Sequence, residues 1–206
     1  MRRKITVVGA GNVGSTIAQI LAYKRLGDIV LVNRTPEKAK GIALDLAQSF
    51  PSEGIELEIT GTGDYRETRN SDVVVITAGL PRSEGMSRDD LLKANSKIVK
   101  EAASKLARYS PRAVMVVVTN PLDAMCYVAW KSSGFDKRKV VGMAGVLDTT
   151  RFEYFIAQEL AVPFTNVKGL VLGGHGDLML PLPGHTKVRG VPLKKLLSES
   201  LSLIHI

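Results

Sequence analysis

One histidine of this 206-residue chain stands in a setting that favours proton transfer. His175 lies within the glycine-rich run GGHGD, so backbone and substrate can approach its ring closely. Upstream, Asp148 and Arg151 stand three residues apart at the expected start of a helix. A carboxylate that holds one imidazole nitrogen leaves the other for proton exchange. A guanidinium group fits a carboxylate through two parallel hydrogen bonds. These residues predict acid–base chemistry on a substrate that carries a carboxylate.

A second motif, GAGNVG at residues 9–14, predicts a phosphate-binding loop. It follows a short apolar run and opens a helical pattern, which is the context that gives such a motif its meaning. The glycines allow a tight turn, close approach to a pyrophosphate and close packing of helix on strand. The helix N-terminus then attracts the phosphates. We expect Gly9, Gly11, Asn12, Val13 and Gly14 to bind a dinucleotide; the alternative is a plain tight turn.

Short apolar runs alternate with longer helical patterns through the first two thirds of the chain. This alternation is typical of βαβ units on a parallel sheet. Ser87, with Asp90 three residues later, marks the start of one helix through a capping box. The fold class is therefore α/β, with a doubly wound parallel sheet of the Rossmann type over residues 1–143. We expect strands at 5–8, 29–32, 57–61, 72–78, 113–118 and 140–142, and helices at 12–23, 36–48, 87–108 and 121–133.

Beyond residue 143 the pattern changes to one helix followed by short extended segments. We expect a helix at about 149–160, a strand at about 167–172 that leads into the His175 loop, and a hairpin-like stretch to Val191. This segment, 144–200, is interpreted as a second domain of α+β type.

Composition limits the possible classes of protein. Hydrophobic residues make up 45% of the chain, and no apolar run reaches the roughly 20 residues that a membrane helix needs. A single cysteine, Cys126, excludes an internal disulfide and, with no signal-peptide pattern, predicts a cytoplasmic protein. The net charge of +8 is spread along the chain, so we expect small anions as ligands and no nucleic acid or membrane partner. The sequence contains no Cys/His cluster that would predict a metal site.

Taken together, these motifs resemble the lactate/malate dehydrogenase family, and its malate branch most closely, over nearly the whole chain to about residue 200. The resemblance implies reversible hydride transfer between a nicotinamide and a small 2-hydroxy acid, with malate and oxaloacetate as the pair. His175 and Asp148 would be the catalytic pair, and Arg151 would bind the carboxylate beside the reacting carbon. The alternatives are a lactate or broader 2-hydroxy-acid dehydrogenase and, for this chain as a C-terminally truncated form that is itself inactive, a non-catalytic dinucleotide-binding fragment.

The resemblance also implies roles for residues in the loops between the two motifs. In the lid-like segment 79–88, Arg82 would read the far carboxylate of a dicarboxylate, and Arg88 would polarise the carbonyl. Asn120 would hydrogen-bond the substrate oxygen and orient the nicotinamide; its other reading is a helix N-cap before Pro121. The remaining residues expected near the cofactor are Thr77, Ala78, Gly79, Asn95 and Val118.

The end of the second predicted strand leaves the choice of cofactor open. Family members usually have an acid there that holds the adenine ribose hydroxyls, whereas this chain has Asn33 and Arg34. Asparagine does not repel a 2′-phosphate, and Arg34 can pair with one. We expect NAD or NADP, with NADP slightly favoured; the alternative is a turn in which Arg34 is simply solvated.

The end of the chain departs from the family pattern. Family members continue well beyond residue 200, so we interpret 144–200 as the incomplete start of the substrate domain, and we expect the full-length form to be a homodimer or homotetramer. Residues 201–206 back-translate into a transposon end used in preparing sequencing libraries. We interpret them as a non-native tail, with a natural amphipathic tail as the alternative.

Overall fold

The structure is a computed structural model that describes residues 2–81 and 83–197. The chain divides into two compact units, Met1–Gly142 and Met143–Ile206. Each unit has its own sheets and its own buried core, as described below. The predicted tail at 201–206 lies outside the described residues.

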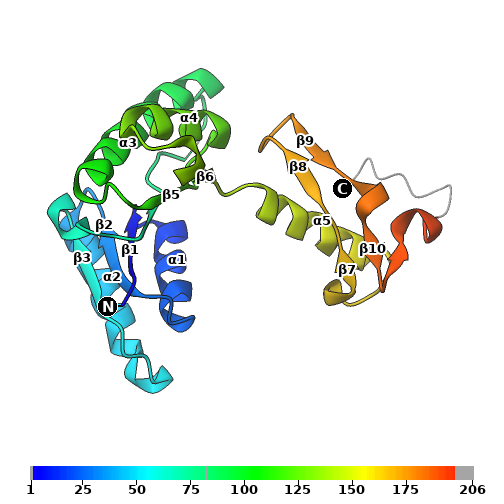
Figure 1. Ribbon diagram of the computed structural model, residues 1–206, viewed down its shortest axis with the longest axis horizontal. Coiled ribbons are helices and arrows are strands. Elements are labelled where there is room, and N and C mark those ends of the chain that lie inside the picture. Colours follow the sequence, from blue (N-terminus) through cyan, green and yellow to red (C-terminus); the bar gives the residue numbers. More distant parts are fainter. Residues whose placement is uncertain (1, 82, 198–206) are drawn as a thin grey trace. The chain divides into compact units, whose positions relative to one another are not determined.

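The first unit is built on a six-stranded parallel sheet (Figure 1). The strand order is β3-β2-β1-β4-β5-β6, so the direction of winding reverses between β1 and β4. This is the doubly wound arrangement in which ligands bind at the carboxyl ends of the strands beside the reversal. The predicted fold class is confirmed. The strands are β1 Lys4–Val8, β2 Asp28–Val32, β3 Ile59–Thr62, β4 Val73–Ile76, β5 Val114–Val117 and β6 Val140–Gly142.

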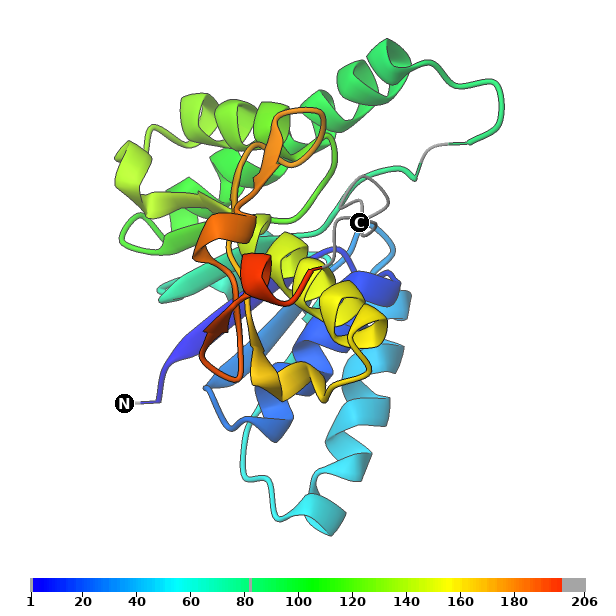
Figure 2. The ribbon, with the colours of Figure 1, turned by 90° about the vertical axis from the view of Figure 1, so that its right-hand side faces the viewer.

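Helices cover the sheet as two pairs. Two clusters of buried side chains join α1 and α2 to one face of the sheet, and α3 packs against α4. Figure 2 shows the blue and cyan helices α1 and α2 next to each other, apart from the green pair. The α-helices are α1 Asn12–Tyr23, α2 Pro36–Ser49, α3 Arg88–Tyr109 and α4 Leu122–Ser133; short 3-10 turns are η1 Pro51–Glu53, η2 Tyr65–Thr68 and η3 Lys137–Lys139.

The capping box predicted for the long helix is present. The Ser87 hydroxyl accepts the Asp90 N–H at 3.1 Å, and the Asp90 carboxylate accepts the Ser87 N–H at 3.2 Å. The same carboxylate accepts the Ser87 hydroxyl at 2.6 Å. These bonds satisfy backbone donors that the first turn leaves without intrahelical partners.

The second unit packs one helix against short antiparallel strands. Its core joins Phe152 and Ile156 of the helix to Val167, Val171 and Val188 of the strands. One sheet has the order β11-β10-β7, and the other pairs β8 with β9. The elements are α5 Gly145–Glu159, η4 Phe164–Asn166, β7 Val167–Lys168, β8 Val171–Gly173, β9 Met179–Pro181, η5 Pro183–His185, β10 Lys187–Val188, β11 Val191–Pro192 and η6 Leu193–Lys195.

The prediction of one continuous strand over 167–172 is wrong. The chain leaves the first sheet after Lys168 and enters the second at Val171. Side chains of α5 take the backbone donors at the break: Gly169 N–H donates to Glu153 Oε1 at 2.8 Å, and Val171 N–H to Thr149 Oγ1 at 3.0 Å. Side chains of α5 therefore take the place of a neighbouring strand as acceptors for the backbone N–H groups at this break.

Candidate active site

The glycines of residues 9–14 differ in what surrounds them. A Cβ at Gly14 would overlap the Gly9 carbonyl oxygen, and a Cβ at Gly9, where φ is +109°, would lie 2.7 Å from Thr77 Oγ1. These two glycines are required by packing at the carboxyl ends of β1 and β4. A Cβ at Gly11 would meet no atom within 4 Å. The surface over Gly11 is therefore open to a ligand, as a pyrophosphate-binding loop requires.

The start of α1 is chemically suited to an anion. Gly11 is its N-cap and offers no side-chain cap, and the first turn carries no acidic residue. The N–H groups of that turn have no intrahelical acceptor, and the helix dipole adds partial positive charge. The predicted contacts Asn12 and Val13 are exposed here, with Val13 showing 53% of its surface. The loop thus fits the phosphates of a dinucleotide.

Asn33 connects this loop to the end of β2. Its Oδ1 accepts the Ala10 N–H at 3.3 Å, and its Nδ2 donates to the Thr35 carbonyl at 3.2 Å. Arg34, the next residue, is exposed and has no hydrogen bond or ion pair within residues 2–81 and 83–197. A cation is therefore available beside the position where an adenine ribose would be read.

The ends of β4 and β5 are joined by side chains. Thr77 Oγ1 donates to the carbonyls of Val8 and Gly9, both at 3.1 Å, so β4 is tied to the glycine loop. Thr119 Oγ1 donates to the carbonyl of Ala78 at 2.8 Å, which ties β5 to β4. Sequence reasoning missed Thr119; its only signal was a hydroxyl side chain directly after a strand and before Asn120.

The remaining predicted residues of the first unit follow β4 and β5 or lie on α3. Asn120 is exposed just beyond β5, and Arg88 is the exposed first residue of α3. The alternative reading of Asn120 as a helix cap is wrong, because α4 begins at Leu122 and Pro121 is its N-cap, with no side-chain bond. Arg82 lies outside the described residues. Ala78 and Val118 are half-buried, Gly79 is exposed, and Asn95 is buried.

The second unit brings His175 and Asp148 into direct contact. His175 Nδ1 lies 2.9 Å from Asp148 Oδ2 across a separation of 27 residues. Asp148 projects from the first turn of α5, and its side chain is only 3% exposed. Its other oxygen, Oδ1, has no hydrogen-bond partner among the described residues. A buried carboxylate with one bond to Nδ1 orients the imidazole ring, and proton exchange with a substrate would then fall to Nε2.

Arg151 lies one turn of α5 beyond Asp148. Its Nη1 is 4.0 Å from Asp148 Oδ1, too far for a hydrogen bond, and its side chain is 61% exposed. The guanidinium makes no hydrogen bond to any residue in the described part of the chain. Its fork is therefore available to an incoming carboxylate.

The glycines flanking His175 also divide into packed and open positions. A Cβ at Gly173, where φ is +92°, would overlap the Leu178 carbonyl oxygen, so this glycine is required by the turn between β8 and β9. A Cβ at Gly176 would meet nothing within 4 Å. The backbone beside His175 is thus open on one side, as an approaching substrate needs.

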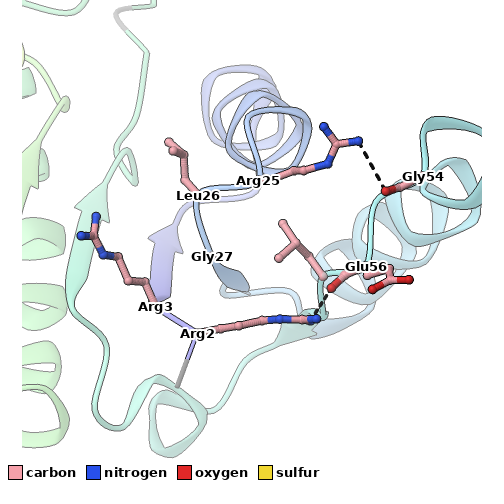
Figure 3. A pocket seen from close by; sticks show the side chains of 8 residues that line it. Arg2, Arg3, Arg25, Leu26, Gly27, Gly54 and Glu56 are labelled. Carbon is pink, nitrogen blue, oxygen red and sulfur yellow. Dashed lines mark hydrogen bonds between the residues drawn. The ribbon is translucent and has the colours of Figure 1, made fainter.

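A pocket at the opposite end of the sheet is not a second candidate. Figure 3 shows it between Arg2 and Arg25, at the amino ends of β1, β2 and β3. Arg25 Nη2 donates to the Glu53 carbonyl at 2.9 Å, and Arg2 Nη1 to the Glu56 carbonyl. Helices α1 and α2 end on this side, where their dipoles place negative charge. The arginines therefore have backbone partners and a negative surrounding, which does not favour an anionic ligand.

Residues 3–142 match the family model of the lactate/malate dehydrogenase NAD binding domain, and residues 145–204 match that of the lactate/malate dehydrogenase alpha/beta C-terminal domain. The chain therefore belongs to the lactate/malate dehydrogenase family, as the motifs predicted. Malate dehydrogenase of Desulforudis audaxviator is 56% identical over 196 residues, which are 95% of this chain and 63% of the relative. Malate dehydrogenase of Methanosarcina mazei is 52% identical over 95% of this chain and 64% of its own length. The chain thus spans a little under two thirds of the curated relatives it matches.

Solved structures of the family have the same fold. Malate dehydrogenase of Picrophilus torridus aligns with a TM-score of 0.92 at 45% identity, over 97% of this chain and 63% of that one. Lactate dehydrogenase of Cryptosporidium parvum, complexed with lactic acid and NAD, aligns with a TM-score of 0.90 at 41% identity, over 95% and 62%. Malate dehydrogenase of Plasmodium falciparum in complex with NADH aligns with a TM-score of 0.86 at 37% identity, over 94% and 61%.

Among the described residues, no helix is both long and apolar enough to cross a membrane. The same part of the chain contains no group of three or more His, Cys, Asp or Glu side chains placed to hold a metal ion.

Proposed function

We propose that this protein is an NAD(P)-dependent oxidoreductase that interconverts malate and oxaloacetate. The observation that supports it most directly is the 2.9 Å contact of His175 with the buried Asp148, with Arg151 one helical turn away. A general base next to a carboxylate-binding fork matches a 2-hydroxy acid, in which the reacting hydroxyl and a carboxylate sit on the same carbon.

In the oxidising direction, His175 Nε2 takes the proton of the substrate hydroxyl while the hydrogen on the same carbon leaves as hydride. Asp148 stabilises the imidazolium that forms. Arg151 holds the adjacent carboxylate, and Arg88 and Asn120 stabilise charge on the reacting oxygen. The nicotinamide, when bound, accepts the hydride, and in the reverse direction it supplies one. Every proton and electron pair that leaves malate is then accounted for.

The glycine loop and the strand ends beside it would hold the dinucleotide. The open surface over Gly11 and the N–H groups at the start of α1 suit the pyrophosphate, and Thr77–Gly79 and Val118 lie at the carboxyl ends of the neighbouring strands. Asn120 follows β5 and would orient the nicotinamide.

Substrate choice in this proposal rests on the charge of Arg82. A site that closes over the methyl group of lactate would leave that arginine desolvated without a partner, which is costly. A second carboxylate pairs with it, so malate gains and lactate loses. The names of the relatives support malate as the substrate, whereas the similarity to the Cryptosporidium lactate dehydrogenase supports lactate as the alternative.

The test is to measure initial rates with oxaloacetate and pyruvate, each with NADH and NADPH. We expect a much larger kcat/KM for oxaloacetate, and a shift toward pyruvate in Arg82→Gln. Equal use of the two keto acids supports the broader 2-hydroxy-acid dehydrogenase instead. Dinucleotide binding with no turnover of either acid supports the non-catalytic module, which the paired His175 and Asp148 do not favour.

We further propose that the protein uses NADP alone or beside NAD. Arg34 has no partner in the described structure and stands next to Asn33, where no carboxylate repels a 2′-phosphate. A charge-assisted contact of about 1.5–3 kcal/mol corresponds to about tenfold to a hundredfold in affinity. Arg34→Ala and Asn33→Asp should each move the ratio of kcat/KM values toward NAD. An unchanged ratio in both variants rejects Arg34 as the reader of the phosphate.

Association and location complete the proposal. We infer a homodimer or homotetramer for the full-length form, which light scattering would measure. A cytoplasmic location agrees with the single cysteine, since Cys126 has no internal disulfide partner.

A further inference from the structure

Asn95 is a buried amide whose bonds all go to the backbone of the two loops that carry the candidate substrate residues. It lies on α3 and is 1% exposed. Its Oδ1 accepts the Leu80 N–H at 2.8 Å, and its Nδ2 donates to the Leu80 carbonyl at 3.2 Å. The same Nδ2 donates to the Asn120 carbonyl at 2.7 Å. Both N–H donors of the amide and one acceptor site are thus in use.

The arrangement places Asn95 at a junction. Leu80 is the last residue but one before Arg82 in the loop that follows β4, and Asn120 follows β5. The β4 loop ends at Ser87, the N-cap of α3, about two helical turns before Asn95. The Asn95 side chain therefore links the start of the β4 loop and the end of β5 to α3.

Packing at Gly79 shows that the junction is tight. A Cβ added at Gly79 would lie 2.5 Å from Thr119 Cγ2 and 3.2 Å from Asn95 Oδ1. The backbone before Leu80 is therefore held between Thr119 and Asn95, and Asn95 has little room to move. A direct contact with a bound dinucleotide, the role expected from the resemblance, does not suit a side chain with 1% exposure and three bonds to the protein's own backbone.

We propose that Asn95 is a positioning residue. It fixes the distance between the backbone at Leu80 and the backbone at Asn120, and it thereby aligns the β4 loop with Asn120 for the reaction. This inference rests on the proposed function for its effect on catalysis, but its structural part does not. Misplacing a reacting group by about 1 Å can cost about a hundredfold in rate. An amide that holds two loops by three bonds is suited to prevent such a shift.

The structural part is tested by amide hydrogen exchange at Leu80, measured by NMR on the 206-residue chain. Asn95→Leu removes all three bonds at similar volume, so exchange of the Leu80 N–H should speed up at least tenfold. Asn95→Asp places a second oxygen against the two carbonyls and loses both donated bonds. It keeps the acceptor for the Leu80 N–H, so its effect on the Leu80 exchange rate should be smaller than that of Asn95→Leu. Val99→Ala, a fully buried position one turn further along α3, is the matched control for general destabilisation and should leave Leu80 unchanged after correction for global stability.

The catalytic part is tested by steady-state kinetics and by titration with NADH. A positioning role predicts that Asn95→Leu and Asn95→Asp lower kcat for oxaloacetate by about tenfold to a hundredfold, with little change in the Kd for NADH. A direct cofactor contact predicts the opposite, a raised Kd for NADH with an unchanged Leu80 exchange rate. That opposite pattern, or a Leu80 rate that Asn95→Leu leaves at the Val99→Ala level, overturns the proposal. A faster Leu80 rate in a protein that binds NADH but turns over no 2-keto acid retains the junction, rejects its effect on catalysis in this chain and supports the non-catalytic dinucleotide-binding alternative.

Discussion

Glycines that share one motif have separable roles at the scale of single residues. Gly14 is required by the fold, because a Cβ there would overlap the Gly9 carbonyl, whereas Gly11 faces open space. The spacing of the motif gives Gly11 and Gly14 the same significance, and only their packing distinguishes the two residues.

The substitutions Gly11→Val and Gly14→Ala should therefore give opposite results. Gly11→Val should fold with normal stability and lose dinucleotide binding, because its side chain fills only the open surface that the pyrophosphate needs. Gly14→Ala should lower the free energy of unfolding, because the backbone between β1 and α1 must shift. Urea unfolding and fluorescence titration with NADH measure the two effects. Normal NADH affinity in Gly11→Val would show that the cofactor lies elsewhere.

The pair His175 and Asp148 allows a second prediction at this scale. His175→Asn should keep NADH binding and lose about a hundredfold to ten-thousandfold in kcat, because proton transfer is lost. Asp148→Asn should also lower kcat, because the imidazolium loses its buried counter-charge. Rapid-reaction measurement of the hydride step, with NADH affinity as the internal control, checks both. Turnover by His175→Asn at the parental rate would remove His175 from the mechanism.

At the scale of elements, the capping box of Ser87 and Asp90 stabilises the start of α3. Ser87→Ala should destabilise the protein by about 1 kcal/mol, because the capping hydroxyl is lost. The exposed helix position Lys97→Ala is the control and should stay within about 0.5 kcal/mol. Urea midpoints at a constant m-value give the comparison. Equal stability of the two variants would mean that the cap contributes nothing.

The same cap predicts a dependence on pH. Bonds from the Ser87 hydroxyl and N–H lower the pKa of Asp90 below its ordinary value of 3.8. A lowered carboxyl pKa stabilises the folded state above the ordinary value and loses that effect as pH falls through the lowered one. The difference in stability between the parent and Ser87→Ala should therefore be constant near neutral pH and shrink below about pH 4.

Local patterns predicted the elements of this chain wherever neighbours in sequence decide the structure. The α1 bounds, the Ser87 cap and the glycine loop are of this kind. The break after Lys168 was not predictable, because the acceptors for Gly169 and Val171 come from α5 side chains 16 and 22 residues away. Asn95 was placed in the site by resemblance, but its partners depend on which face of α3 meets the strand ends, and no local pattern specifies that.

At the scale of the whole molecule, the chain carries two separate cores and two separate halves of the candidate chemistry. The glycine loop belongs to the unit whose core includes Val7 and Leu31, and the His175–Asp148 pair belongs to the unit whose core includes Phe152 and Val188. The predicted dinucleotide loop and the proposed proton-transfer pair thus belong to different units.

This separation predicts where dinucleotide binding stabilises the chain. A ligand present at 100 times its Kd stabilises the state that binds it by about 2.7 kcal/mol, which slows amide exchange through unfolding about a hundredfold. NADH should slow exchange in β1 and β2 by that factor, because the glycine loop exists only when these strands are folded. Exchange in α5 and β10 should slow far less, since their core contains no predicted phosphate contact. Hydrogen-exchange mass spectrometry with and without NADH makes the comparison, and Gly11→Val should abolish the difference. Equal slowing in both units would show that they unfold together, against the independence that their separate cores imply.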